Sequence, residues 1–400
     1  MRSIAKPILA SLLLVPAVSC RDEPTAPTSS DVTPVEAPVS AATAPLTFRN
    51  IGAGAFHSCG LTTDNRAYCW GGNGSGQLGK GTGGHTLVPV AVVGGLQFRQ
   101  ISVGYEFTCG VTLSNVAYCW GQNFFGQLGQ GTDGSDHFQE NSPVKVHGGH
   151  QFQQVRAGYT HACAITVTQV AYCWGENSDG KLGDGTTTQR TLPVRVKGNL
   201  KWLQLSGGGL HTCGITTANE VYCWGTNDNG QLGDGTRVTR THPVKVVGGL
   251  LARQIEVGGY HSCALDLDHR PRCWGLNLRG GLGDGTTTDR NRPVAVAGSL
   301  RFDYVSAGDL HTCGATHLGR LYCWGSNDSG RLGDGTATTR LTPVSTSPAL
   351  SFLVPGAGLS HTCAVATNGL GYCWGAGGGR LGDPDNAPAR FSPFPVAPPM

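Results

Sequence analysis

The sequence predicts an all-β fold in which seven copies of a repeat of about fifty residues close into a seven-bladed β-propeller. Fourteen cysteines after residue 20 form seven pairs, and the members of every pair are ten residues apart. The first members recur every fifty residues, with one step of fifty-four between Cys109 and Cys163. There are 62 glycines and only 14% charged residues, which favours short strands and tight turns over long helices.

The N-terminal segment predicts export. Arg2 and Lys6 precede a short apolar run at 8–15, as in a signal peptide covering residues 1–19. The run ends in Ala-Val-Ser-Cys20, which resembles a bacterial lipobox except that leucine usually stands where Ala17 does. We therefore expect a lipid on Cys20, with a plain secretory signal as the alternative. Residues 20–46 are rich in Pro, Thr, Ala and Ser and predict a disordered linker before a propeller at 47–398.

One copy shows why each cysteine pair predicts a disulfide. Residues 209–215 and 221–225 alternate apolar and polar side chains around a short polar turn, which is typical of a β-hairpin. Tyr222 and Trp224 then share one face, while Cys223 lies on the other face opposite Cys213. A zinc site is less favoured because no CxxC spacing occurs. The predicted pairs are Cys59/Cys69, Cys109/Cys119, Cys163/Cys173, Cys213/Cys223, Cys263/Cys273, Cys313/Cys323 and Cys363/Cys373.

The second half of each copy adds turns and an outer strand. Residues 227–236 are dense in glycine and turn formers, and 243–246 follow as a short strand led by proline. With the run at 253–257, each unit has about four strands. Such a sheet is able to bury both of its faces only against neighbouring sheets, which predicts that the sheets stack radially around one axis.

These motifs resemble the regulator-of-chromosome-condensation repeat. The pattern G-x-x-H-[ST]-C-x-[IL], then C-W-G-x-N-x-x-G-x-L-G-D-G-T and P-V-x-V, covers roughly residues 47–398. The resemblance implies seven blades of four antiparallel strands. It also implies, as alternatives to a scaffold role, guanine-nucleotide exchange on a Ran-type GTPase with chromatin binding, or inhibition of a secreted enzyme such as a β-lactamase.

The closing blade is left open by the sequence. Pro38-Val39 lies ten residues before Phe48, while Pro393-Phe394 ends the last copy. Both segments resemble the outer strand of a repeat, so either terminus is able to complete the ring.

Two recurrent polar positions are expected to be structural. Six copies carry a histidine at one position, and Phe107 replaces it in the second copy; we expect a hydrogen bond inside each blade and not a metal-binding ring. Asp and Arg recur six residues apart, as in Asp234 and Arg240, and predict a polar pair that stabilises a turn. The histidines are His57, His161, His211, His261, His311 and His361.

The second copy departs most from the repeat and provides the candidate binding residues. It carries Tyr105-Glu106-Phe107 and a loop lengthened by four residues, with aromatic and acidic side chains that include Asp133. Clustered aromatic residues on a loop are typical of an interaction site, and drift in a surface loop is the alternative. The candidates are Tyr105, Phe124, Phe125, Asp136, His137, Phe138 and Glu140.

The predicted function is that of a non-enzymatic protein-binding scaffold outside the cytoplasm, either anchored to the bacterial cell envelope by its N-terminal lipid alone or secreted. No Gly-x-Ser-x-Gly elbow, Walker loop or His-Glu-x-x-His motif occurs in the sequence, and we expect neither an enzyme nor a cofactor, although acidic residues converging on the central channel would indicate a hydrolase or lyase. The 29 basic residues, which include Arg2 and Lys6, nearly balance 26 acidic ones, which argues against nucleic-acid binding. We expect a monomer whose partner is an unidentified protein or cell-surface polymer.

Overall fold

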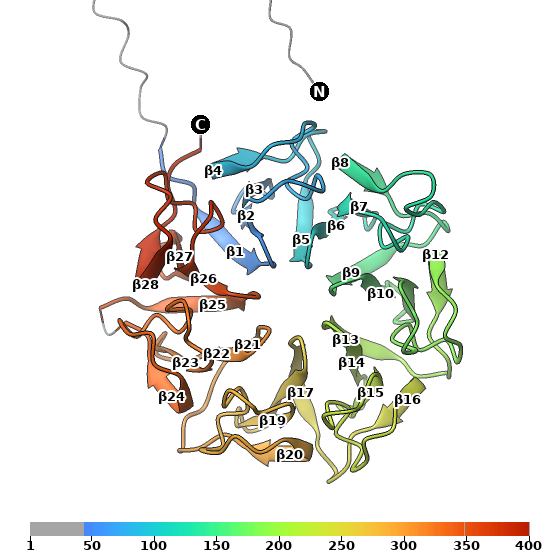
Figure 1. Cartoon of the computed structure of the whole chain (residues 1–400). Coiled ribbons are helices and arrows are strands. Elements are labelled where there is room, and N and C mark those ends of the chain that lie inside the picture. Colours follow the sequence, from blue (N-terminus) through green and yellow to red (C-terminus); the bar gives the residue numbers. More distant parts are fainter. Residues whose placement is uncertain (1–43, 348, 400) are drawn as a thin grey trace, which may run out of the picture. The chain divides into compact units, whose positions relative to one another are not determined.

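The structure is a computed structural model that describes residues 44–347 and 349–399. The predicted signal peptide, Cys20 and most of the predicted linker lie outside the described residues. Within them, 28 strands form seven separate four-stranded antiparallel sheets arranged around a central axis (Figure 1). The all-β, seven-bladed propeller is thus confirmed. Across the described ranges, no helix has the length and hydropathy needed to cross a membrane.

Each blade is built from four consecutive strands that run from the channel outwards (Figure 1). The innermost strands are β1 (Phe48–Ala53), β5 (Phe98–Val103), β9 (Phe152–Ala157), β13 (Trp202–Gly207), β17 (Ala252–Val257), β21 (Tyr304–Ala307) and β25 (Phe352–Ala357). The second strands are β2 (His57–Thr62), β6 (Phe107–Thr112), β10 (His161–Thr166), β14 (His211–Thr216), β18 (His261–Asp266), β22 (His311–Ala315) and β26 (His361–Ala366).

The two outer strands of each blade carry the Trp-Gly and Pro-Val motifs. The third strands are β3 (Ala67–Gly71), β7 (Ala117–Gln122), β11 (Ala171–Gly175), β15 (Val221–Gly225), β19 (Pro271–Gly275), β23 (Leu321–Gly325) and β27 (Gly371–Ala376). The outermost strands are β4 (Thr86–Ala91), β8 (Gln139–Lys145), β12 (Arg190–Arg195), β16 (Arg240–Lys245), β20 (Arg290–Ala295), β24 (Arg340–Ser345) and β28 (Ala389–Pro395).

The disulfides form as the hairpin pattern predicts. Cys213 on β14 lies directly opposite Cys223 on β15, with a Cα–Cα distance of 4.0 Å, and the pair is bonded. Each bond joins the two middle strands of one blade, and all fourteen cysteines are completely buried, so they belong to the core and not to a binding surface. The bonded pairs are Cys59–Cys69, Cys109–Cys119, Cys163–Cys173, Cys213–Cys223, Cys263–Cys273, Cys313–Cys323 and Cys363–Cys373.

The tryptophans connect one blade to the next. Trp274 is fully buried against the Cys213–Cys223 disulfide of the preceding blade, and its Nε1 donates to the Gln231 carbonyl oxygen over 2.9 Å. The alternation of side chains explains this arrangement, because a strand that presents Trp to one neighbour presents Cys to the other. Each hairpin therefore supplies a tryptophan to the interface with the preceding blade and a disulfide to the interface with the following blade.

The ring closes without an exchanged strand. The C-terminal strand β28 pairs with β27 and completes the seventh blade, with Phe394 opposite Cys373. The C-terminus thus supplies the outer strand that the sequence left unassigned, while Pro38-Val39 lies outside the described residues. Side chains join the last blade to the first: Ser58 Oγ lies 2.8 Å from His361 Nε2, and Trp70 Nε1 donates to the Arg380 carbonyl oxygen.

The Asp-Arg pairs stabilise the turn before the outer strand in blades three to seven, as the pattern predicts. Arg240 Nη2 lies 2.9 Å from Asp234 Oδ2, and the Thr236 amide donates to Asp234 Oδ1 over 2.9 Å. Burial alone would raise the pKa of Asp234, but the hydrogen bonds from Thr236 and Arg240 hold it below its usual value. The last copy has an equivalent pair, Asp383 and Arg390, at a spacing of seven residues that the sequence pattern did not include.

Candidate functional site

The strand order sends two kinds of connection to opposite faces of the ring. Connections after the innermost and third strands, such as 54–56 and 72–85, emerge on one side, which we call the long-loop face. Connections after the second and outermost strands, such as 63–66 and 92–97, emerge on the other side, the short-turn face. This division follows from antiparallel pairing, because successive connections alternate between the two ends of a sheet.

The recurrent histidines join adjacent blades, which corrects the expectation of a hydrogen bond inside each blade. His211 Nε2 lies 2.8 Å from Ser262 Oγ on the next blade, and that hydroxyl donates to the Gln231 carbonyl oxygen. Within one strand, the histidine and the following Ser or Thr point to opposite faces, so each can only meet a neighbouring blade. The six pairs are His57–Thr108, His161–Thr212, His211–Ser262, His261–Thr312, His311–Thr362 and His361–Ser58.

Burial keeps these histidines neutral. Desolvation lowers the pKa of His57, His161 and His211 to about 3 and that of His261 to about 4. In addition, no group of three or more His, Cys, Asp or Glu residues able to hold a metal ion occurs in the described residues. The six histidines serve to join neighbouring blades through these hydrogen bonds.

The seam between blades two and three replaces this pair with an apolar contact. Phe107 occupies the histidine position and is completely buried, and Ala162 stands where the other blades carry Ser or Thr. Both residues belong to one hydrophobic cluster. Part of the departure seen in the second copy is therefore a change in the core of the ring and not on its surface.

Aromatic side chains gather around the channel mouth on the long-loop face. The rings of Phe56, Tyr105 and Tyr159 follow one another from blade one to blade three, with centroids 5.6 and 5.0 Å apart. All three are half-buried, like the apolar residues that lie one or two positions before the histidine in the other blades. We call these three aromatic side chains, together with Leu359, which also lines this end of the channel, the collar.

A hydrogen bond spans the channel mouth inside the collar. Tyr159 Oη donates to Asp309 Oδ1 over 2.6 Å, which connects blade three to blade six. Gly259 makes room for this bond, because a side chain there would collide with the Asp309 carboxylate. Burial raises the pKa of Tyr159, and the charge of Asp309 raises it further. Only about 80 Å³ of space is left at this end of the channel.

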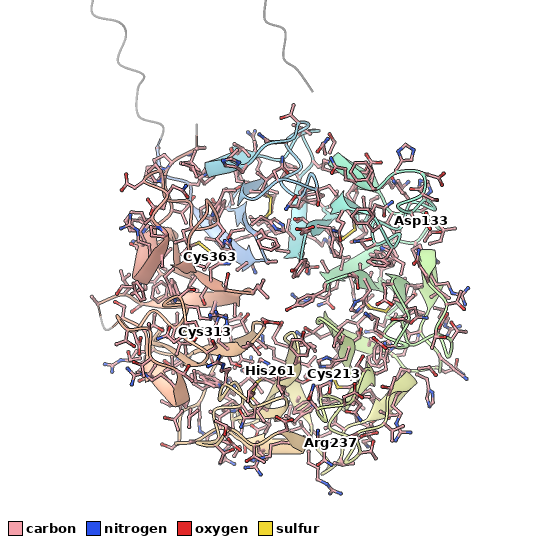
Figure 2. The ribbon with its side chains drawn as sticks, viewed as in Figure 1. Asp133, Cys213, Arg237, His261, Cys313 and Cys363 are labelled. Carbon is pink, nitrogen blue, oxygen red and sulfur yellow. A yellow bond between two sulfur atoms is a disulfide. The ribbon has the colours of Figure 1, made fainter. Side chains whose placement is uncertain are left out.

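The structure separates the candidate binding residues into two groups on the long-loop face. Tyr105 belongs to the collar, whereas the others lie on the β7–β8 connection or, for Glu140, at the start of β8, towards the outer edge of blade two, where Figure 2 shows Asp133. Phe124 and Phe138 are 51% and 54% exposed and stack with centroids 6.1 Å apart. We call this stacked pair the aromatic shelf.

The remaining candidates surround the shelf. Asp136 and His137 are exposed, and Phe125 is half-buried. Glu140 accepts a hydrogen bond from Gln130 Nε2 over 3.1 Å. Their part in binding stays a prediction, as does that of the shelf and of Tyr105.

The other end of the channel is wide and polar, and the sequence analysis did not identify its residues. The innermost strands enclose a cavity of about 600 Å³ that opens towards the short-turn face. Its carboxyl groups each face a cationic or titratable partner: Glu256 lies 3.6 Å from Arg156 Nη2, and Asp303 lies 3.0 Å from His269 Nδ1. The alternation of polar side chains in the innermost strands is the signal that indicates such a lining.

Comparison with known proteins identifies relatives that match most of the chain. A family model of the RCC1-like domain matches residues 20–301, and models of the regulator of chromosome condensation (RCC1) repeat match 302–331 and 319–365. Human WBSCR16 has a similar structure, with a TM-score of 0.74, 21% identity, and coverage of 80% of this chain and 87% of that chain.

Two further solved structures are similar at comparable identity. Prp20p from Saccharomyces cerevisiae, described with its binding properties to Gsp1p and histones, has a TM-score of 0.72 at 22% identity, covering 88% of this chain and 87% of that chain. The ectodomain of the Physcomitrella patens receptor kinase CR4 has a TM-score of 0.55 at 21% identity, covering 82% of this chain and 74% of that chain. At these identities the likeness concerns the fold.

Proposed function

The chain belongs to the family of proteins with an RCC1-like domain, and on this premise we propose that it is an extracytoplasmic scaffold that binds a protein through its long-loop face. The family fold supplies a rigid ring whose loops are free to vary. The disulfides and buried tryptophans fix the strands from which those loops project, so the loops are in position in the unbound protein. Preorganisation of this kind lowers the entropic cost of association.

The observation that carries the proposal is the collar together with the aromatic shelf. Tyrosine and other aromatic residues are enriched among the residues that dominate binding energy at protein interfaces. Tyr105 and Tyr159 offer ring surface at the centre of the long-loop face, and Phe124 with Phe138 extends that surface to the rim. The channel mouth is spanned by the Tyr159–Asp309 bond, so this end suits the contact of a broad surface better than insertion of a ligand.

Charge near the shelf specifies the chemistry of the partner. Asp133 and Asp136 are at least partly exposed on the β7–β8 connection and Glu140 at the start of β8, while Glu106 is half-buried beside Tyr105 of the collar. The partner surface should therefore combine apolar side chains with Lys or Arg residues placed to meet these carboxylates.

Export is supported by cysteine usage and by the N-terminal segment. Disulfides form and persist in oxidising compartments and are rare in the cytosol, and this chain has seven. The signal peptide at 1–19, lipid attachment at Cys20 and the linker to residue 46 complete the proposal for a tethered propeller at 47–398. Nucleotide exchange would instead require a cytoplasmic or nuclear GTPase partner.

Site-specific photocrosslinking on intact cells tests the proposal. A photoreactive residue at Phe124 or Tyr105 should capture a discrete extracytoplasmic protein, whereas the same probe at Leu318 should not, because that exposed residue lies on the short-turn face. Phe124→Ala/Phe138→Ala should abolish capture from Tyr105 without changing the thermal transition. Equal capture from both faces, or capture of a cytoplasmic GTPase, would contradict the proposal.

A further inference from the structure

The wide end of the channel has the properties of a small-molecule site. It encloses about 600 Å³ between the seven innermost strands, which is within the range of about 300–1,000 Å³ typical of ligand sites. Two layers of inward-pointing side chains line it. The layer next to the short-turn face includes Gln100, Gln154, Gln204 and Gln254, and the inner layer consists mainly of serines together with Arg156 and Glu256.

Most polar groups of this lining are already used to join blades. The Gln204 side chain donates to the Ile255 carbonyl oxygen over 3.0 Å and accepts from the Ile255 amide over 3.1 Å. It thus satisfies the edge of the next blade in the way that the backbone of a further strand would. Gln100 and Gln254 bind the next blade in the same way. The serines of the inner layer accept from backbone amides of the following blade. These side chains are therefore structural.

Gln154 and Arg156 of blade three depart from this pattern. Gln154 Oε1 accepts from the Leu205 amide, as in the other blades. The Leu205 carbonyl oxygen, however, accepts from Arg156 Nε over 3.2 Å and not from the Gln154 side chain. The Nη groups of Arg156 donate no hydrogen bond to the described residues, and 28% of its side chain is accessible from the cavity. A guanidinium group with free Nη donors is suited to bind a carboxylate through two parallel hydrogen bonds.

Glu256 supplies the opposite charge beside it. Its carboxylate lies 3.6 Å from Arg156 Nη2, beyond hydrogen-bond distance, and it accepts only long contacts of 3.3–3.4 Å from Gln204, Ser206 and Gln254. Burial raises the pKa of this carboxyl against the opposing effect of Arg156. Desolvated charges are well stabilised only when their remaining donors and acceptors are satisfied, and this pair leaves such donors and acceptors open to a ligand.

We propose that the channel binds a small zwitterion of the α-amino-acid class, whose carboxylate pairs with Arg156 and whose ammonium group pairs with Glu256. The two charges of such a molecule are separated by a single carbon atom, which suits two protein charges that lie side by side. The free amide donors of Gln154 face the same space and serve the ligand's oxygen atoms. The ligand enters from the short-turn face, because the other mouth is spanned by Tyr159 and Asp309.

Isothermal titration calorimetry on the full chain tests this site with glycine, L-alanine and L-glutamine. L-Alanine methyl ester lacks the carboxylate, and N-acetyl-L-alanine lacks the ammonium group. We expect the wild-type protein to bind at least one free amino acid, and each blocked analogue of alanine to bind about tenfold more weakly or worse than alanine. Absence of binding for all three amino acids, or equal binding of glucose, would overturn the proposal.

Variants assign the two charges separately. Arg156→Gln should weaken amino-acid binding about tenfold and abolish the preference for the acid over the ester, while Glu256→Gln should abolish the preference for the free over the acetylated amine. Arg237→Gln, on the outer edge of blade four (Figure 2), is the matched control and should change nothing. The neutral pair Arg156→Gln/Glu256→Gln leaves no unpaired buried charge; if it folds and still binds the amino acid with wild-type affinity, the assignment is wrong.

Discussion

Six seams between blades and the seam between blades two and three solve one packing problem in different ways. In the six, a buried histidine meets a hydroxyl group, as His211 meets Ser262 at 2.8 Å. In the seventh, Phe107 meets a cluster that contains Ala162. The two positions have changed together, because a buried histidine without its hydroxyl partner would leave a polar nitrogen unsatisfied. The residue at the histidine position and the residue that faces it on the next blade therefore stabilise a seam together, and neither does so alone.

The tryptophan contact is common to both kinds of seam. Trp174 Nε1 donates to the Gln127 carbonyl oxygen across the apolar seam, over 2.9 Å, and Trp224 donates to the Lys181 carbonyl oxygen across a histidine seam at the same distance. Every seam thus buries a tryptophan against the disulfide of the preceding blade, while the histidine pair adds a polar, directional contact that one seam does without.

The largest expected effect comes from removing that common contact. Trp174→Ala and Trp224→Ala should each lower the free energy of unfolding by about 3–5 kcal/mol, because each leaves a large cavity beside a buried disulfide. Denaturant unfolding under non-reducing conditions measures both. A clearly smaller loss for Trp174 than for Trp224 would show that the apolar seam depends less on its tryptophan, against our expectation.

A smaller effect should follow from placing a histidine in the apolar seam. Phe107→His alone should lower stability by about 2–3 kcal/mol, because it removes buried apolar surface and leaves the imidazole unpaired. Adding Ala162→Thr supplies the missing hydroxyl and should recover part of the loss. A double-mutant cycle of urea unfolding measures this coupling, and strict additivity of the two changes would contradict the view that the two residues stabilise a seam together.

The last expected effect concerns the pH dependence of stability; it is absent at neutral pH and grows only as the pH falls. The folded pKa of His211 is about 3, below the unfolded value near 6.5, so its contribution is complete above about pH 6.5 and is lost progressively as the pH falls towards 3. His211→Phe/Ser262→Ala should therefore reduce the slope of stability against pH by about 1.4 kcal/mol per pH unit in that window.

Unfolding of the wild-type and variant proteins at a series of pH values between about 4 and 7 gives the two slopes to be compared. Parallel curves would mean that His211 binds its proton equally well in the folded and unfolded states. The tyrosine and carboxyl groups of the channel mouth are unchanged in the variant, so they contribute equally to both curves.

The candidate surface was only partly predictable from the sequence. Phe124 and Phe138 are among the clustered aromatic residues that predict an interaction site, and the structure has both of them exposed. Phe107, in the same irregular copy, is completely buried, and nothing in a single copy distinguishes a changed core residue from a changed surface residue. Of the collar, the sequence singled out only Tyr105, because Phe56, Tyr159 and Leu359 lie in other copies and approach it only when the loops meet around one axis.

The sequence by itself determined what depends on short separations along the chain. The disulfides join residues ten apart, and the Asp-Arg pairs of the turns join residues six apart, so the hairpin and turn that contain them are sufficient to bring them together. The number of blades follows from counting these local units. Alternation along a strand was also sufficient to place Trp and Cys on opposite faces of a blade.

Only the tertiary structure decided which groups meet across blades. His211 and Ser262 are 51 residues apart, and Tyr159 and Asp309 are 150 apart, so their contacts exist only when the ring is closed. Arg156 and Glu256 meet because the channel brings two non-adjacent blades together over Ser206. The repeat places equivalent residues at equivalent heights around one axis. Which of them form bonds depends on their distances in the closed ring, and these distances cannot be predicted from spacing along the sequence.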